Sequence, residues 1–80
     1  MTHVVYVLES QRDQGLYIGM TRNLSVRLKR HNAGFVRSTK ARRPFNVLGC
    51  RHFGSLEEAH QAELRLKSFK DPIRVRAWIG

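Results

Sequence analysis

Cysteine is nearly absent from this 80-residue chain, and its scarcity excludes one class of protein and disfavours another. The single cysteine, Cys50, cannot form an intramolecular disulfide, so the chain is not a small scaffold held together by disulfides. Cys50 follows Val47, Leu48 and Gly49 in an apolar run, where we expect a buried, reduced thiol. One cysteine and four scattered histidines also disfavour a zinc site.

Acidic residues are also few: 6 Asp and Glu stand against 15 Lys and Arg, which leaves a formal net charge of +9. An excess of this size in so short a chain favours nucleic-acid binding over a merely basic soluble protein. The sequence contains no recognition-helix or zinc-finger pattern, so sequence-specific recognition is not expected.

Long hydrophobic runs are missing as well. The run Val4–Leu8 is too short for a membrane span and lacks the basic flank of a secretory signal, so we expect a cytoplasmic protein that does not enter a membrane. A chain of 80 residues lies near the lower limit for one hydrophobic core. We therefore expect a single domain over residues 1–80.

The residues that are present predict three strands and three helices in the order ββαβαα. Two β-prone segments flank a polar, glycine-ended loop and predict an antiparallel hairpin. Asn23 and Gly34 are placed to begin and end the first helix, and Ser55 and Glu58 have the spacing of a capping box. The expected strands are 3–9, 16–20 and 46–53, and the expected helices are 24–32, 55 to 69 or 70, and 73–78. This order predicts an α+β fold, a three-stranded antiparallel sheet with flanking helices.

The first predicted helix carries charged or titratable side chains on its apolar face. Positions 24, 27, 28 and 31 share one face, so Arg27 and His31 lie beside Leu24 and Leu28. An ionised group on a buried face is costly unless something pairs with it, and a phosphate held over a polar site is a suitable partner.

The long second helix shows the same feature. Its expected inward set is Leu56, Ala59, Glu63 and Leu66, and Glu63 is the one carboxylate among them. Tyrosine hydroxyls, an arginine, a histidine and a lone carboxylate on core-facing positions would form a compact polar pocket of the kind that phosphoryl chemistry needs.

The ordered set of these residues resembles the GIY-YIG nuclease domain, especially its small stand-alone, UPF0213-like members related to the nuclease domain of nucleotide-excision repair. Val4-Val5-Tyr6 stands where the family has Gly-Ile-Tyr, and Tyr17-Ile18-Gly19 matches the second motif as written. The resemblance extends from about Val4 to Lys67. Its further matching positions are Thr21, Leu24, Arg27, Leu28, His31, Asn32, Gly34 and Glu63.

The resemblance implies a metal-dependent endonuclease that leaves 5′-phosphate and 3′-hydroxyl ends. By this analogy the catalytic residues are Tyr6, Tyr17, Arg27, His31 and Glu63. The tyrosines would position or deprotonate the attacking water, Arg27 and His31 would contact the phosphate, and Glu63 would hold Mg²⁺ or Mn²⁺. It also implies that the central strands carry the tyrosines. Some relatives have an asparagine beyond the metal-binding glutamate, and here no asparagine follows Asn46.

Each of these residues also has a purely structural interpretation. The tyrosines are suited to be core aromatics with satisfied hydroxyls, and Arg27 to be a surface side chain whose stem lies along the apolar face. His31 is equally suited to be a half-buried structural histidine. Glu63 could be the buried partner of Arg27.

A basic loop follows the first helix. It contains Arg37, Lys40, Arg42 and Arg43, and Lys67 adds to the same basic surface. The alternative is a solubilising run of charge, but the flanking residues Phe35 and Phe45 could stack a base while the cations neutralise phosphates.

Together these features predict a DNA endonuclease, which the resemblance places near DNA repair. DNA is favoured over RNA, and DNA structure or a protein partner would supply the targeting. The alternative prediction is a catalytically inactive nucleic-acid-binding module.

Overall fold

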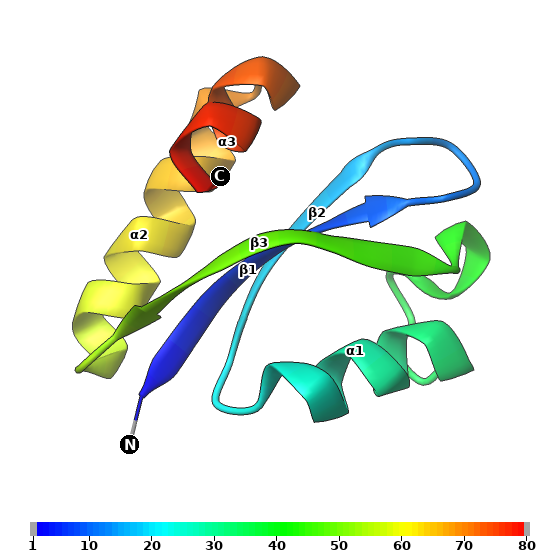
Figure 1. Ribbon diagram of the computed structural model, residues 1–80, viewed down its shortest axis with the longest axis horizontal. Coiled ribbons are helices and arrows are strands. Elements are labelled where there is room, and N and C mark those ends of the chain that lie inside the picture. Colours follow the sequence, from blue (N-terminus) through cyan, green and yellow to red (C-terminus); the bar gives the residue numbers. More distant parts are fainter. Residues whose placement is uncertain (1, 80) are drawn as a thin grey trace.

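The computed structural model describes residues 2–79 and has an α+β fold in the predicted order ββαβαα (Figure 1). One additional 3₁₀ helix, η1, lies within the stretch predicted to be a loop. No helix among residues 2–79 has the length and apolarity that crossing a membrane requires. The elements are β1 (His3–Ser10), β2 (Leu16–Thr21), α1 (Leu24–Ala33), η1 (Lys40–Arg42), β3 (Phe45–Phe53), α2 (Leu56–Phe69) and α3 (Pro72–Ile79).

The sheet has the strand order β2-β1-β3, and β1 pairs antiparallel with both neighbours. Tyr6 on β1 lies opposite Gly19 on β2, and Leu8 lies opposite Tyr17. Because side chains alternate between the faces of a strand, Tyr17 points to the same face as Tyr6, one diagonal step away. Of the two tyrosines, the central strand β1 therefore carries only Tyr6. Tyr17 lies on an edge strand, which corrects the expectation that central strands carry both tyrosines.

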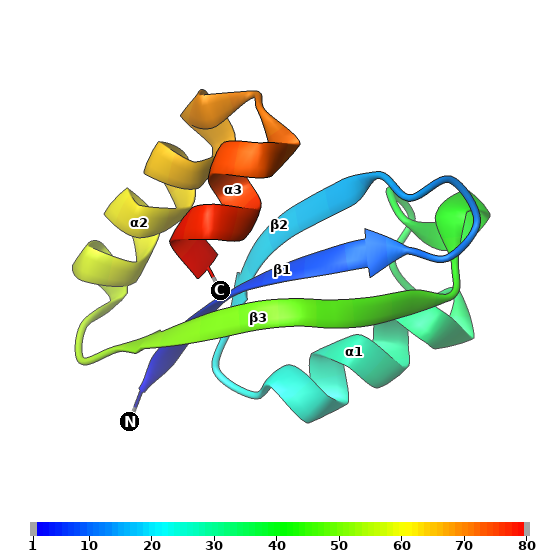
Figure 2. The same cartoon turned by 45° about the horizontal axis from the view of Figure 1, so that its top comes forward.

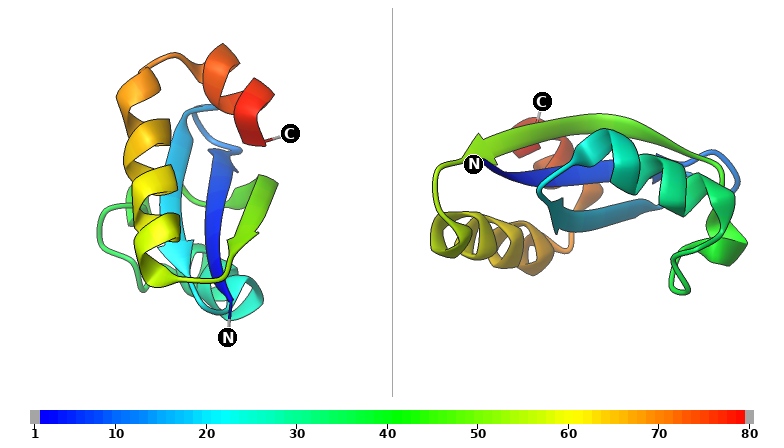
Figure 3. Two further views of the ribbon diagram at one scale, coloured as in Figure 1. Left: turned by 90° about the vertical axis from the view of Figure 1, so that its left-hand side faces the viewer. Right: turned by 90° about the horizontal axis from the view of Figure 1, so that it is seen from below.

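Each face of the sheet has its own apolar cluster. Val5 and Val7 of β1 point to one face and pack with Ala59, Ala62 and Leu66 of α2 and with Val75 and Ile79 of α3. Tyr6 and Leu8 point to the other face and pack with Phe45 and with Leu24 and Leu28 of α1. Figures 2 and 3 show the resulting layers, with α2 and α3 on one side of the sheet and α1 on the other. Because successive side chains of β1 point to opposite faces of the sheet, this one strand contributes to both apolar clusters.

The helix ends follow the predicted capping residues. The Asn23 side chain accepts a hydrogen bond from the Val26 N–H, and Gly34 ends α1 in the left-handed conformation with φ of 84°. The Ser55 hydroxyl accepts from the Glu58 N–H to begin α2.

Two burial predictions were wrong. Leu56, expected to point inward, is 56% exposed, because α2 begins at this residue and its buried face is formed by Ala59, Ala62 and Leu66 instead. Cys50 is half-buried rather than buried, because it packs only at the margin of the cluster around Tyr6.

Candidate functional site

A chain of hydrogen bonds joins β1, α1 and the basic loop at the centre of the candidate site. The Tyr6 hydroxyl lies 3.0 Å from His31 Nε2, and His31 Nδ1 lies 2.7 Å from Thr39 Oγ1. All three residues are completely buried. The Thr39 hydroxyl in turn donates to the Val36 carbonyl at 3.3 Å.

The direction of this chain follows from its two ends. The Val36 carbonyl can only accept, so the single Thr39 hydroxyl proton points to it and Thr39 Oγ1 accepts from His31 Nδ1–H. In a neutral imidazole the other nitrogen then lacks a proton, so His31 Nε2 accepts the Tyr6 hydroxyl proton. His31 is therefore a hydrogen-bond acceptor for Tyr6.

The electrostatics agree with two neutral partners. Burial raises the pKa of the Tyr6 phenol, while the neighbouring Arg27 lowers it. Burial, followed by the positive charge of Arg27, lowers the pKa of His31. At neutral pH the pair therefore consists of a protonated phenol and an uncharged imidazole.

Arg27 and Tyr17 complete this side of the site. Arg27 interacts most strongly with Tyr6 and less strongly with Tyr17, and these interactions raise the pKa of the guanidinium. Its Nε is buried and has no hydrogen-bond partner among residues 2–79. The Tyr17 ring lies 5.0 Å from the His31 ring and 6.3 Å from the Tyr6 ring, measured between centroids, and Tyr17 is only half-buried. A buried unpaired donor beside two tyrosines favours an anionic ligand.

Gly19 keeps the two tyrosines close together. A Cβ atom at this position would lie 2.5 Å from the Tyr6 hydroxyl oxygen and 3.1 Å from Cε1 of Tyr17. Both distances are shorter than an ordinary van der Waals contact. The ring of Tyr6 can therefore lie across β2 only because residue 19 has no side chain.

Glu63 approaches from α2, in the layer on the opposite face of the sheet. Its side chain is 15% exposed, forms an ion pair with Lys67 at 3.5 Å and lies 3.8 Å from His60 Nδ1. Arg27 is not among its ion-pair partners within the described residues. The carboxylate contributes to the raised pKa of Tyr6, as the weakest of the causes. Glu63 is thus linked electrostatically to the tyrosine cluster without contacting Arg27.

The donor set fits a magnesium ion held by few protein groups. No cluster of three or more His, Cys, Asp or Glu side chains occurs among residues 2–79, so Glu63 would be the single protein ligand. Mg²⁺ commonly binds through one or two carboxylates and fills its remaining positions with water and phosphate oxygens. A zinc site would require more protein ligands than the described residues provide.

The predicted nucleic-acid-binding residues fall into two groups. Arg37, Lys40 and Arg43 are exposed, as the prediction requires. Arg42 instead pairs with Asp13, with 3.0 Å between Nε and Oδ2, and its guanidinium lies 5.7 Å from the Phe45 ring centroid. Arg42 therefore fixes the loop to the β1–β2 hairpin.

The two phenylalanines that flank this loop also differ. Phe45 is buried in the core, whereas Phe35 is 75% exposed. Only Phe35 is available to stack on a base.

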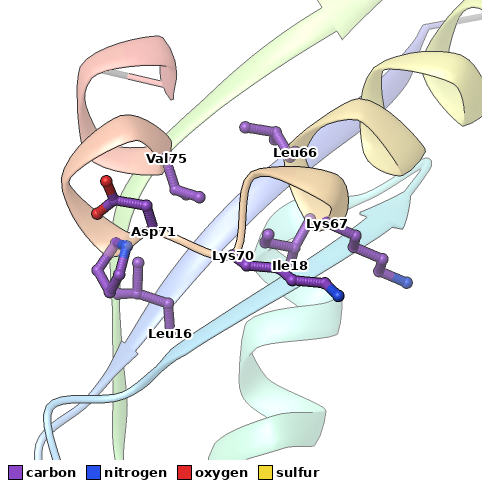
Figure 4. A pocket seen from close by; sticks show the side chains of 8 residues that line it. Leu16, Ile18, Leu66, Lys67, Lys70, Asp71 and Val75 are labelled. Carbon is purple, nitrogen blue, oxygen red and sulfur yellow. The ribbon is translucent and has the colours of Figure 1, made fainter.

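Lys67 borders a hollow of about 210 Å³ between β2 and the junction of α2 and α3 (Figure 4). Leu16, Ile18, Leu66 and Val75 give the hollow an apolar floor. In Figure 4 the Lys67 and Lys70 side chains both extend away from the Asp71 carboxylate. Lys67 also pairs with Glu63, so it is coupled to the candidate metal ligand.

Sequence reasoning missed two residues that hold the site in shape. Thr39 orients His31, and the buried Ser10 hydroxyl donates to the Arg42 carbonyl at 2.5 Å while accepting from the Arg12 and Asp13 N–H groups. Both are small hydroxyl residues in polar surroundings, and no periodic pattern marks them. Their roles depend on the basic loop folding back over α1 and the hairpin.

Comparison with known proteins gives consistent matches. Residues 2–74 match the GIY-YIG catalytic domain family. A UPF0213 protein of Oceanobacillus iheyensis is 46% identical over 66 residues, covering 81% of this chain and 76% of the relative. One from Streptococcus pneumoniae is 44% identical over 69 residues, covering 85% and 69%. The solution NMR structure of a UPF0213 protein from Bacillus halodurans superposes with a TM-score of 0.53 at 30% identity, over 96% of this chain and 94% of that one.

Proposed function

This chain belongs to the GIY-YIG catalytic domain family, and from that premise we propose that it is a metal-dependent endonuclease that hydrolyses phosphodiester bonds in DNA. GIY-YIG domains are endonuclease domains, so the family indicates a nuclease and a nucleic-acid substrate. The observation that carries the proposal is the buried, unpartnered Nε of Arg27 beside Tyr6 and Tyr17. A guanidinium held in this way is prepared to bind a phosphate oxygen.

The two tyrosines take different roles in this proposal. Tyr17 is half-exposed and can reach a water molecule next to a bound phosphate. Tyr6 is fully buried and donates its hydroxyl proton to His31, so it holds Arg27 and Tyr17 in place. Tyr17 is therefore assigned to orient the attacking water, and Tyr6 and His31 act as positioning residues.

Charge stabilisation comes from two sides of the site. Arg27 contacts the scissile phosphate and stabilises the negative charge that grows in the transition state. Glu63 would hold Mg²⁺ or Mn²⁺, which when bound polarises the phosphate and stabilises the departing oxygen. Lys67, which pairs with Glu63, supplies a further positive charge beside the same carboxylate.

Recognition is proposed to depend on DNA structure rather than on sequence. Arg37, Lys40 and Arg43 are exposed cations suited to phosphates, which carry no sequence information directly. A protein partner would supply further targeting. DNA repair and a cytoplasmic location are the setting that we propose for this activity.

A cleavage assay tests the proposal directly. Purified protein with Mg²⁺ or Mn²⁺ is incubated with duplex, branched and single-stranded DNA and with matched RNA, and EDTA is added to parallel samples. We expect cuts in branched or single-stranded DNA that EDTA abolishes and that Arg27→Ala removes. If every substrate stays intact with both metals but is still bound, the protein is an inactive nucleic-acid-binding module.

A further inference from the structure

Two aromatic rings, Phe69 at the end of α2 and Trp78 on α3, are each covered by an arginine. Arg74 lies over the Phe69 ring at 4.5 Å from its centroid, and Arg51 of β3 lies over the Trp78 ring at 4.1 Å. A hollow of about 310 Å³ is lined by Phe69, Arg74, Ala77 and Trp78. We call the four residues Arg51, Phe69, Arg74 and Trp78 the α3 platform.

The charges of the α3 platform are not neutralised within the described part of the chain. Arg76 of the same helix pairs with Glu9, and Arg42 pairs with Asp13, but Arg51 and Arg74 have no acidic partner among residues 2–79. Arg51 donates one hydrogen bond, to the Trp78 carbonyl at 2.5 Å. A guanidinium has five N–H donors, so most of them stay available to an anion.

The α3 platform is separate from the candidate catalytic site. Phe69, Arg74 and Trp78 belong to the layer of α2 and α3, whereas Arg27 and His31 lie on α1 at the other face of the sheet (Figure 2). Glu63 is the candidate catalytic residue that shares the α2 layer, and it is not part of the platform. The family match ends at residue 74, so Trp78 lies beyond it. Arg51, Phe69 and Arg74 lie within the matched range, and Trp78 adds the second aromatic ring from outside it.

We propose that the α3 platform is a second contact site for single-stranded nucleic acid. An unpaired base enters the hollow and stacks against its aromatic and guanidinium surfaces, while Arg51 and Arg74 neutralise the adjoining phosphates. Aromatic rings combined with unneutralised arginines favour a polynucleotide over an apolar peptide, which would leave both cations without a partner. The inference rests on the proposed nucleic-acid substrate but not on cleavage.

A second site on the opposite face would explain how the protein selects DNA by structure. A strand that occupies the α3 platform cannot continue as regular duplex past Arg27 and Tyr17, which lie on the other face of the sheet. A branched DNA, with one unpaired arm, offers separate segments to the two sites. The platform thus defines the substrate as DNA with an unpaired arm.

The experiment uses Trp78, the single tryptophan of the chain, as its probe. The full-length protein is titrated in EDTA with a thymidine oligonucleotide of about 12 residues, and Trp emission is recorded beside the anisotropy of a dye on the DNA. We expect emission to be quenched with the same midpoint as the anisotropy, because a stacked base quenches the indole. A duplex of equal length should bind with little quenching.

Four variants make the test specific. Arg74→Ala removes an exposed cation of the platform and should weaken the affinity for single-stranded DNA about tenfold. The slope of log affinity against log salt concentration should become shallower by roughly 0.7. Lys29→Ala removes one exposed cation from α1, on the other face, and should leave the quenching at saturation unchanged. Trp78→Phe, which keeps an aromatic ring, should retain the affinity that Trp78→Ala loses.

Three outcomes would overturn the proposal. The first is DNA binding by anisotropy with unchanged Trp78 emission. The second is an equal loss of affinity and of quenching in Arg74→Ala and Lys29→Ala, which would reveal only general electrostatic attraction. The third is emission that changes with protein concentration alone together with a dimer in sedimentation, which would make this face a contact between two copies. Each result is independent of cleavage, so the failure of the platform and the failure of the nuclease proposal can be told apart.

Discussion

The Tyr6 hydroxyl is held at 3.0 Å from His31 Nε2, and this hydrogen bond joins the central strand to α1 beside their apolar packing. The imidazole is fixed on its other side by Thr39 at 2.7 Å, so both ring nitrogens are used inside the protein. His31 can gain a proton only if the Tyr6 hydroxyl stops donating to it. Protonation of one histidine is therefore coupled to the packing of a strand, a helix and a loop.

Acid should destabilise the fold through His31. Burial, and next the charge of Arg27, lower the pKa of the folded-state imidazole from its ordinary value of 6.5. The unfolded chain then takes up this proton at a higher pH than the folded chain does. The stabilising contribution is present above about pH 6.5 and is lost as the pH falls through the folded-state pKa. Urea unfolding from about pH 8 to about pH 5 should show this loss.

A pair of variants identifies the responsible group. His31→Gln should be less stable at neutral pH, because it breaks the chain between Tyr6 and Thr39, and its stability should fall less on the acid side. His52→Gln, at an exposed position on β3, should keep the slope of the unaltered protein. A slope that survives intact in His31→Gln would show that another group controls acid stability.

The α1 part of the site was predictable because it depends on local periodicity. Arg27, Leu28 and His31 lie on one helix face, and the structure confirms that this face turns toward the sheet. The helix begins after Asn23 and ends before Gly34 as predicted, since both residues act through hydrogen bonds within a few positions of the chain. Spacing alone was sufficient for these features.

The parts that depend on tertiary packing were not predictable in the same way. Thr39 contacts His31 only because the basic loop folds back on α1. Arg42 forms an ion pair with Asp13 of the β1–β2 hairpin, so its charge is not free to bind a phosphate as predicted. Glu63 lies at the margin of the buried face of α2, whose phase is set by Ala59, Ala62 and Leu66 packing on the sheet. The catalytic roles themselves stay predictions until they are measured.

Gly19→Ala should disrupt the tyrosine pair. The added methyl group would lie 2.5 Å from the Tyr6 hydroxyl oxygen and 3.1 Å from the Tyr17 ring, so one ring must move. We expect a loss of about 1–3 kcal/mol in the free energy of unfolding and a fall in cleavage rate. Gly54→Ala is the matched control, because nothing lies within 4 Å of its Cβ position. Equal behaviour of the two variants in melting and cleavage would contradict the proposed role of Gly19.

The basic loop should contribute to binding through three of its four predicted cations. Replacing Arg37, Lys40 and Arg43 together by Ala should weaken DNA binding and reduce the slope of log affinity against log salt by up to roughly 0.9 per lost phosphate contact on duplex DNA. All three side chains are exposed, so thermal stability should be nearly unchanged. Filter binding at several salt concentrations measures the slope.

Arg42→Ala should behave differently from the other loop variants. Arg42 pairs with Asp13, so its removal should loosen the contact between the loop and the hairpin and lower the melting temperature, with a smaller effect on the salt slope. If the triple variant keeps the original slope while Arg42→Ala reduces it, the nucleic-acid contact lies at Arg42 instead.

Glu63→Gln separates catalysis from stability at the candidate metal ligand. The change keeps the volume of the side chain and removes its charge, so cleavage should fall by about 100-fold or more if Glu63 is the metal ligand that we propose, because a neutral amide would hold the divalent ion poorly. DNA binding should hold or tighten, since a negative charge leaves a basic surface. The contacts that are weakened join Glu63 to the exposed side chains of Lys67 and His60, so stability should change by no more than about 1 kcal/mol. A buried pair with Arg27 would have cost roughly 3–5 kcal/mol, and the structure provides no such pair.

Glu57→Gln, at an exposed position in the first turn of α2, is the control and should cut at the rate of the unaltered protein. A Glu63→Gln variant that still cuts at that rate would remove Glu63 from the catalytic assignment, whatever its melting temperature.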